Sequence, residues 1–477
     1  MRPFLIRFIA CVLLLTGCAV KYVGPDLGAI YNRSAGYHGE LRNPVILIPG
    51  IAGSKLIDSQ SGHVVWGAFA GGYADPKRPD GARRIALPLR EGVSLSELRD
   101  SVIPDGALDR LRMVLFGLPI EMSAYFHILG TLGIGGYRDE LLGTSGAIDY
   151  GDNHFTCFQF DYDWRRDNVE SAKRLHEFIL EKRAYVQAEL EKRYGIANYD
   201  VKFNIVAHSM GGLIARYYLR YGPIDLPEDG SIPPVTWAGA RYVEHVILVG
   251  PPNAGSVKSL IRLVRGRKFG PFLPKYEPAI LGTMPAMYQL LPRGRHGALV
   301  DAADPQRWID DILSPELWED MGWGLAAPDQ DHMLQWLLPN IEHPADRRRI
   351  ALDHQWKCLK RAKQFASALD VPASSPEGLT LSLIAGDALS TPAVVSVNRS
   401  NGEIELIERG PGDGIVLRSS ALMDERVAGD WSPTLVSPIG WTQVLFLFTG
   451  HLEMTRDPAF TDNILFLLLE QPRQQSF

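Results

Sequence analysis

Four short apolar runs, separated by helical stretches, constrain the fold of this chain more than any other feature of its sequence. The runs show no alternation of apolar and polar side chains, which is typical of strands that are covered on both faces. They lie at residues 44–48, 155–160, 201–206 and 243–249. Strands of this kind that alternate with helices build a parallel sheet flanked by helices. We therefore predict an α/β fold around a mostly parallel central sheet.

Helical stretches lie between these runs, and further strand-like runs follow. Residues 168–194 carry apolar side chains at helical spacing and stop at Gly195. Residues 211–221 form a second helical stretch that stops at Gly222, before a proline. Strand-like sequence resumes at residues 379–385, 394–397, 403–408 and 444–448. The sheet is therefore expected to continue near the carboxyl end of the chain.

Two intervals interrupt the alternation of strands and helices. Residues 57–151 hold segments punctuated by Gly and Pro with few clean strands, and residues 257–370 hold helical pieces with five Trp residues. We expect the second interval to be a largely helical cap or lid over the carboxyl edge of the sheet. Its Trp side chains from Trp308 to Trp336 are expected to be buried in the cap, with a belt at a lipid interface as the alternative. The core of the fold then comprises residues 43–256, with the first interval inserted, and residues 371–477.

The first residues are predicted to be a targeting segment. Two arginines precede an apolar run at residues 8–15 that is too short to span a bilayer, and Leu-Thr-Gly-Cys ending at Cys18 fits a bacterial lipobox. We expect residues 1–17 to be a signal peptide, Cys18 to be the lipidated mature N-terminus and residues 18–42 to be a tether. By resemblance to Gram-negative lipoproteins, the alanine after Cys18 fits outer-membrane sorting. The alternative is an ordinary cleaved signal, with Cys18 incidental.

Composition excludes several other classes of protein. Of the 477 residues, 46% are hydrophobic and 22% are charged, so the chain is expected to bury a core. A net charge of −6 argues against electrostatic binding of nucleic acid. No His-Glu-x-x-His or similar spacing indicates a metal site. Beyond the leader, Cys157 and Cys358 can at most form one disulfide, and we expect Cys157 to be a buried, inert thiol.

The pentapeptide at residues 207–211, Ala-His-Ser-Met-Gly, follows one predicted strand directly and precedes a predicted helix. A sharp turn between strand and helix, with small residues two before and two after a serine, is typical of a nucleophile elbow. We therefore predict that Ser209 is a catalytic nucleophile. His208 is interpreted as a turn residue that points away from the site. The alternative is that Ser209 merely caps the helix.

A serine nucleophile needs a base and an orienting carboxylate, which follow it in the order acid, then histidine. His451 lies between a predicted strand and the last predicted helix, where the catalytic base belongs. Two acids fit the order. Asp387 ends an apolar strand, which is the generic position of the acid, and Asp413 lies beyond a β-ribbon. The residues alone leave this choice open.

A glycine-containing loop at residues 49–54 leaves the first predicted strand at the topological place of an oxyanion hole. Such a hole stabilises the negative charge that develops on the carbonyl oxygen during acyl transfer. We assign it to the backbone N–H groups of Ile51 and Met210. The loop lacks the lysine spacing of a phosphate-binding loop, so that alternative is not favoured.

Five short blocks of this sequence together resemble one known family. They lie at residues 44–56, 136–137 with 162–165, 207–211, 250–256 and 412–416. In these blocks the chain is similar to the lecithin–cholesterol acyltransferase (LCAT) family, which includes lysosomal phospholipase and phospholipid–diacylglycerol acyltransferases. The blocks are spread over most of residues 43–470, whereas the intervening insertions match poorly.

The resemblance implies a fold, a chemistry and a set of site residues. It implies the α/β-hydrolase fold and the transfer of a fatty acyl group from a glycerolipid to Ser209, and then to an alcohol or water, without a cofactor. It places the catalytic acid at Asp413 rather than Asp387, and the base at His451. Ala207 departs from the family's usual glycine, and the cysteine-closed lid loop of mammalian relatives has no counterpart here. The resemblance therefore says least about the lid and about the specificity for the acceptor.

We therefore expect a monomeric serine-dependent acyltransferase or lipid acyl hydrolase, anchored by lipid in a bacterial cell envelope and acting on membrane lipid or lipid aggregates. A general lipase or carboxylesterase for soluble esters is one alternative. A surface-binding lipoprotein that has kept only the hydrolase scaffold is another. The basic stretch at residues 258–268 is interpreted as a solvated helix face, with attraction of anionic headgroups as the alternative.

Overall fold

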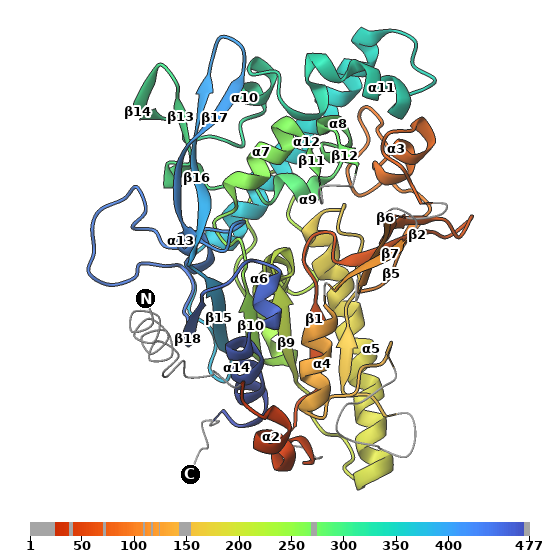
Figure 1. The fold of residues 1–477 in the computed structure, drawn as a ribbon, viewed down its shortest axis with the longest axis vertical. Helices are drawn as coiled ribbons and strands as arrows, with labels where there is room; N and C mark the ends of the chain where they lie inside the picture. Colours follow the sequence, from red (N-terminus) through yellow and green to blue (C-terminus); the bar gives the residue numbers. More distant parts are fainter. Residues whose placement is uncertain are drawn as a thin grey trace, which may run out of the picture.

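A computed structural model describes residues 24–37, 42–69, 73–107, 110–115, 118–123, 125–142, 154–268 and 274–471. Its centre is a sheet of six parallel strands in the order β18-β15-β10-β9-β1-β8 (Figure 1). The strands are β1 (Val45–Ile48), β8 (Cys157–Gln159), β9 (Phe203–His208), β10 (Val243–Val249), β15 (Thr380–Gly386) and β18 (Gln443–Leu447). The predicted α/β fold with a parallel sheet is confirmed.

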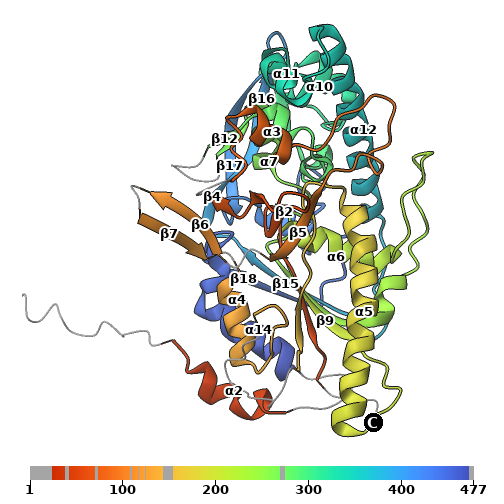
Figure 2. The ribbon, with the colours of Figure 1, turned by 90° about the vertical axis from the view of Figure 1, so that its right-hand side faces the viewer.

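Helices cover both faces of this sheet, which explains why its strands are mostly apolar. Ile46 and Ile48 of β1 belong to a core that also holds side chains of α5 (Asn168–Tyr194) and α6 (Met210–Tyr221). Val45 and Leu47 belong to a second core with α4 (Phe126–Ile134) and α14 (Pro458–Leu469). Figure 2 shows the two helical layers on opposite sides of the strands. Successive side chains of one strand thus enter different apolar layers.

The bounds of α5 agree with the sequence prediction because both of its ends are marked by capping residues. Asp167 accepts a hydrogen bond from the N–H of Val169 at the amino end, and Gly195 adopts the left-handed conformation after the carboxyl end. A glycine there avoids the clash that a Cβ atom would make in this conformation. Helix α6 starts at Met210, one residue before the predicted start.

The insertion near the amino end contains more strands than the sequence suggested. One three-stranded sheet consists of β2 (Ser54–Asp58), β3 (Val64–Trp66) and β5 (Val102–Ala107). A second contains β4 (Ala68–Phe69), β6 (Arg110–Leu115) and β7 (Leu118–Ser123). Helix α3 (Pro79–Ile85) precedes β5. These strands have at most six residues each, and β5 contains both Pro and Gly, so no long periodic signal marks them in the sequence.

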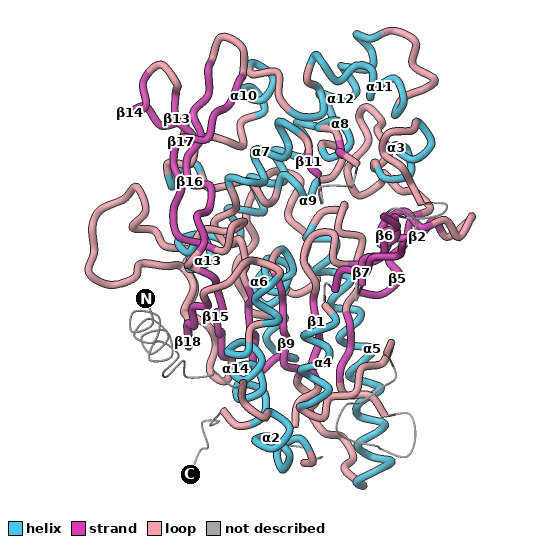
Figure 3. Tube along the Cα trace, in the orientation of Figure 1, coloured by secondary structure: helices cyan, strands magenta, loops and turns pink. Residues whose placement is uncertain are grey.

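The cap above the carboxyl ends of the strands is helical but also includes a sheet (Figures 1 and 3). Its helices are α7 (Val257–Arg265), α8 (Pro278–Leu281), α9 (Pro285–Tyr288), α10 (Pro315–Asp320), α11 (Asp331–Leu337) and α12 (Pro344–Asp370). Strands β16 (Leu389–Asn398) and β17 (Glu403–Gly412) rise from the core as a ribbon and join β13 (Leu299–Asp301) and β14 (Asp304–Trp308). The expected boundary at residue 370 therefore does not separate core from cap, because this later ribbon pairs with a cap strand.

The expected tether contains a helix that packs on the body. Helix α2 (Leu27–Ala35) contacts α14 and α4, and the buried Tyr31 donates a hydrogen bond to Oδ1 of Asp462 at 2.7 Å. Residues 27–35 are therefore anchored on the body, unlike the free tether expected for residues 18–42. The predicted signal peptide and Cys18 lie outside the described residues. Within the part of the chain that is described, no helix combines the length and apolarity needed to cross a bilayer.

Candidate active site

Ser209 occupies a strained turn between β9 and α6. Its backbone has a φ of 54° and a ψ of −124°, which is uncommon for a residue other than glycine and is typical of functional turns. The turn also needs Gly211, because a Cβ atom at that position would lie 2.6 Å from the carbonyl oxygen of Pro49. Ala207, the departure from the LCAT pattern, is completely buried at the end of β9. The geometry is that of a nucleophile elbow.

The structure brings Ser209, His451 and Asp413 together in one hydrogen-bonded chain. Nε2 of His451 lies 2.9 Å from Oγ of Ser209, and Nδ1 lies 2.7 Å from Oδ2 of Asp413. An ionised carboxylate only accepts hydrogen bonds, so the Nδ1–H group donates to Asp413. In the neutral imidazole, Nε2 is therefore free to accept the proton of the Ser209 hydroxyl. All three residues are buried, with exposures of 7% for Ser209, 8% for His451 and 3% for Asp413.

The surroundings of Asp413 favour its ionised form. Burial alone would raise the pKa of Asp413, but the contact with His451 and two backbone N–H groups lower it below its ordinary value. The N–H groups of Ile415 and Val416 donate to Oδ1 at 2.9 and 2.7 Å. Oδ1 thus fixes the carboxylate to the backbone, while Oδ2 accepts the hydrogen bond from the imidazole.

The two acids that the sequence left open have different surroundings. Asp387 lies 3.8 Å from Nε of Arg418 and forms no hydrogen bond with His451. The two ends of the β16–β17 ribbon lie side by side, because Leu389 pairs with Gly412 and forms an isolated bridge with Asp413. Asp413 therefore reaches the end of β15 although it lies 26 residues beyond Asp387 in the sequence.

The predicted oxyanion groups lie beside Ser209. A Cβ atom at Gly50 would lie 2.8 Å from Cβ of Ser209, so the loop after β1 passes directly against the serine. Met210 is the first residue of α6, where backbone N–H groups have no acceptor within the helix. Among the described residues, no hydrogen bond occupies the N–H of Ile51 or of Met210. Both groups can therefore donate to an added oxygen.

The interpretation of His208 as a residue that points away from the site is wrong. His208 is buried, and its Nδ1 lies 2.9 Å from the hydroxyl of Tyr125 while its Nε2 lies 3.0 Å from the carbonyl oxygen of His451. Burial, followed by the proximity of His451, lowers the pKa of His208 to about 3. Tyr125 was not found from the sequence because it lies in no motif and reaches the site only through the fold.

The cysteines and the basic stretch noted in the sequence take no part in the hydrogen bonds between Ser209, His451 and Asp413. Both Cys157 and Cys358 are free and buried, and burial raises the pKa of each thiol. The basic stretch is not simply a solvated face, because Lys258 donates to the carbonyl oxygen of Gly414 at 3.1 Å. Across the described residues, no group of three or more His, Cys, Asp or Glu side chains is arranged to hold a metal ion.

Comparison with known proteins agrees with the fold and with the predicted resemblance. The model of the family "Lecithin:cholesterol acyltransferase" matches residues 139–314, which include the elbow but not Asp413 or His451. Lysosomal phospholipase A and acyltransferase from Bos taurus is 24% identical over 261 residues. That match covers 55% of this chain and 51% of the relative, so the chain spans about half the relative's length. The resemblance to the LCAT family is confirmed.

A solved structure with a similar fold covers most of the chain. A chain in the crystal structure of the Tle4–Tli4 complex has a TM-score of 0.50 and 15% identity, covering 89% of this chain and 98% of its own. EstA from Clostridium botulinum has a TM-score of 0.35 and 14% identity, covering 91% of this chain and 88% of its own. At 15% identity, the likeness to the chain of the Tle4–Tli4 complex concerns the fold alone, and that fold is of the α/β-hydrolase type.

Proposed function

We propose that this protein catalyses serine-dependent acyl transfer on lipid esters. A fatty acyl group would pass from a glycerolipid to Ser209 and then to an alcohol acceptor or to water. The observation that carries this proposal is the hydrogen-bonded chain from Ser209 through His451 to Asp413 at a nucleophile elbow. The relationship to the LCAT family supports the choice of lipid esters.

The first half of the reaction forms an acyl-enzyme. Oγ of Ser209 attacks the ester carbonyl carbon while Nε2 of His451 takes its proton. The N–H groups of Ile51 and Met210 would stabilise the resulting oxyanion, and each such donor lowers a barrier by about 3 kcal/mol. When the intermediate collapses, the bond to the alkoxy oxygen breaks and His451 returns the proton to that oxygen. Asp413 orients the imidazole and stabilises its charged form without taking the proton.

The second half of the reaction transfers the acyl group to an acceptor. His451 takes a proton from water or from an alcohol as that oxygen attacks the acyl-enzyme, and then returns it to Oγ of Ser209. Water yields a free fatty acid, whereas an alcohol yields a new ester. The same residues serve hydrolysis and transfer to an alcohol. The ratio of the two products therefore depends on how well the cap excludes water from the acyl-enzyme.

Exposed apolar side chains around the base support a lipid surface as the source of substrate. Phe448 and Leu452 flank the loop that carries His451, and their exposures are 84% and 50%. Leu389, which forms the bridge with Asp413, is 42% exposed. Leu389 also lies against this loop, because a Cβ atom at Gly450 would lie 3.4 Å from its Cδ1. Exposed apolar side chains that gather at a site are typical of contact surfaces. A lipid aggregate would cover these three side chains as it delivers an ester.

Incubation with a labelled phospholipid, with and without a sterol or diacylglycerol, tests the proposal. We expect lysophospholipid together with a free fatty acid or a new acyl ester, and no product from Ser209→Ala. Activity on soluble esters without any gain on micelles would indicate a general esterase instead. A wild-type chain that neither turns over lipid nor reacts with a fluorophosphonate would indicate a non-catalytic scaffold.

We also propose that the chain is a monomer held in a bacterial cell envelope by lipid at Cys18. The lipobox before Cys18 supports this, together with the apolar run that precedes it. Two or more acyl chains would make the anchor lasting, since each buried methylene contributes about 0.8 kcal/mol. Mass spectrometry of the native protein should find a lipidated N-terminal cysteine. An unmodified N-terminus at any other residue would contradict the anchor.

A further inference from the structure

A chain of buried hydrogen bonds links the oxyanion loop to the loop of the base. The N–H of Gly50 donates to the hydroxyl oxygen of Tyr125 at 2.7 Å. That hydroxyl lies 2.9 Å from Nδ1 of His208, and Nε2 of His208 lies 3.0 Å from the carbonyl oxygen of His451. Tyr125 and His208 are 3% and 2% exposed. Four segments that are distant in sequence are thus joined beside Ser209.

The chemistry of these groups fixes which one donates in each of the three hydrogen bonds. The carbonyl oxygen of His451 can only accept, so Nε2–H of His208 donates to it. Nδ1 of the neutral ring then accepts, and the hydroxyl of Tyr125 donates to it. The hydroxyl oxygen remains available to accept from Gly50. The arrangement works with one tautomer of uncharged His208, which agrees with the low pKa of about 3 that burial gives this ring.

Gly50 is held on both sides, by Tyr125 through its N–H group and by Gly53 through the carbonyl of the peptide that carries the proposed oxyanion donor. Tyr125 holds the N–H of Gly50, while the carbonyl oxygen of Gly50 accepts from the N–H of Gly53 at 3.0 Å. In a trans peptide the carbonyl and the following N–H point in opposite directions. Fixing the carbonyl of Gly50 therefore also fixes the direction of the Ile51 N–H.

We propose that Tyr125 and His208 are positioning residues, which hold the Ile51 N–H and the His451 main chain in register with Ser209. The inference rests on the proposed function. The ring of His208 lies 4.8 Å from that of His451, between centroids. An uncharged neighbour at this distance does not oppose the positive charge that His451 gains during the reaction. Neither residue touches the reacting atoms, so both act through the groups that they hold.

Substitutions that separate the hydrogen bonds test this proposal. Tyr125→Phe removes only the hydroxyl. His208→Asn keeps an acceptor near Nδ1 and loses the donor to His451, whereas His208→Gln keeps a donor near Nε2 and loses the acceptor for Tyr125. We expect each variant to lower kcat by about 10- to 100-fold while KM changes less than about threefold, because small misplacements of reacting groups slow chemistry more than binding. Fluorophosphonate labelling of Ser209 should slow in parallel.

Tyr288→Phe is the matched control. Tyr288 is also buried, and its hydroxyl donates to the carbonyl oxygen of Gly282 at 3.0 Å in the cap. Its loss should lower the urea midpoint as much as Tyr125→Phe does, but should leave kcat unchanged. Equal kcat values for Tyr125→Phe and Tyr288→Phe would overturn the positioning role. An active Ser209→Ala would instead overturn the proposed function, so the two failures are distinguishable.

Discussion

The hydroxyl of Ser209 carries its proton at neutral pH, so it needs His451 to become a nucleophile. The sequence predicted both residues because each follows a recognisable strand at a position that the hydrolase order requires. It could not choose between Asp387 and Asp413, since the choice depends on where the β16–β17 ribbon returns. It also missed Tyr125, because a hydrogen bond across 83 positions leaves no local pattern.

Removing a member of the Ser209–His451–Asp413 chain should abolish turnover without unfolding the protein. We expect Ser209→Ala and His451→Ala each to lower kcat by a factor on the order of 10⁶, and Asp413→Asn by about 10⁴, because the asparagine favours the wrong tautomer of His451. Initial rates on a phospholipid give these factors. Circular dichroism and urea unfolding are the controls for folding. A folded Ser209→Ala variant with full activity would exclude the mechanism.

Glu425 should make stability depend on pH in acid. Partial burial would raise its pKa, but Arg295 and His296 outweigh this and lower it to about 2. Because the folded pKa is depressed, the contribution is fully present above the unfolded pKa of about 4.5 and is lost as pH falls toward 2. We expect Glu425→Gln to lower the free energy of unfolding by about 1–2 kcal/mol near pH 7, since water screens the half-exposed Arg295. Urea titrations should show this difference disappearing near pH 2; a constant difference would refute the linkage.

At the scale of secondary structure, the central strands and the long helix α5 could be predicted because each carries a strong local signal. Apolar runs marked the strands, and Asp167 and Gly195 marked the ends of α5. The pairing of β16 with β13 could not be predicted, because the two strands lie about 90 positions apart and either could have been an edge. Helix α2 was missed because it has only nine residues; Asp26 caps its amino end, but a helix this short depends on packing, here on α14 and α4.

Glycine at the elbow should be indispensable. A Cβ atom at Gly211 would lie 2.6 Å from the carbonyl oxygen of Pro49 and 2.7 Å from that of Ile48, so the backbone itself would have to move. We expect Gly211→Ala to lower both stability and kcat by displacing the oxyanion loop. Gly130→Ala is the control, because nothing lies within 4 Å of a Cβ atom there, and alanine in this helix should be neutral or stabilising by about 1 kcal/mol. Equal behaviour of the two variants in urea unfolding and kinetics would contradict the steric argument.

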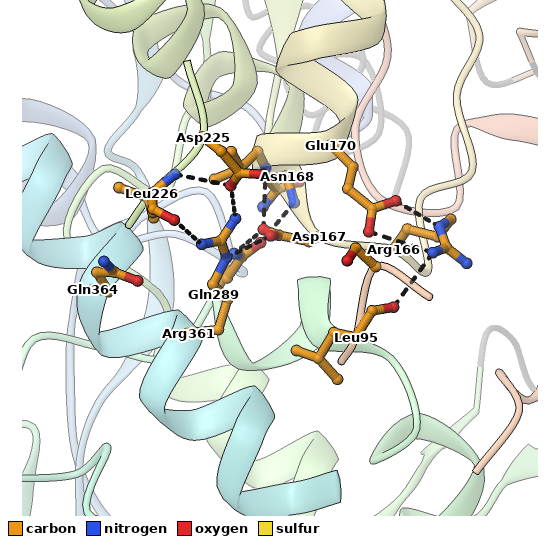
Figure 4. A network of polar contacts seen from close by, with 12 residues as sticks. Leu95, Arg166, Asp167, Asn168, Glu170, Asp225, Leu226, Gln289, Arg361 and Gln364 are labelled. Carbon is orange, nitrogen blue, oxygen red and sulfur yellow. Dashed lines mark hydrogen bonds and ion pairs between the residues drawn. The ribbon is translucent and has the colours of Figure 1, made fainter. Parts of the chain in front are cut away.

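Across the whole molecule, ionic contacts fasten the cap to the core. Figure 4 shows Arg361 of cap helix α12 between Asp167, which begins α5, and Asp225 after α6. Nε of Arg361 lies 2.6 Å from Oδ2 of Asp167, and the side chain of Asp167 is 4% exposed. Gln289 of the cap donates to the other oxygen of Asp167. From the sequence, Asp167 was assigned to the core and Arg361 to the cap, and no motif indicated that the two are in contact.

Removing Arg361 should therefore destabilise the protein strongly. Arg361→Ala leaves the buried Asp167 without its cationic partner, so we expect the free energy of unfolding to fall by about 3 kcal/mol or more. Lys363→Ala on the same helix is the control, because its ion pair with Asp311 is more than half exposed and is worth less than about 1 kcal/mol. Urea denaturation at neutral pH measures both. Equal losses for the two variants would show that the Asp167 contact does not hold the cap.

Covalent labelling with a fluorophosphonate, followed by peptide mass spectrometry, identifies the nucleophile of this protein without any assumption about its substrate. We expect one label per chain, on Ser209, and a large loss of labelling rate in His451→Ala. No label should form on Ser209→Ala. A wild-type chain that turns over lipid but carries its label on another residue, or carries none, would contradict the role of Ser209.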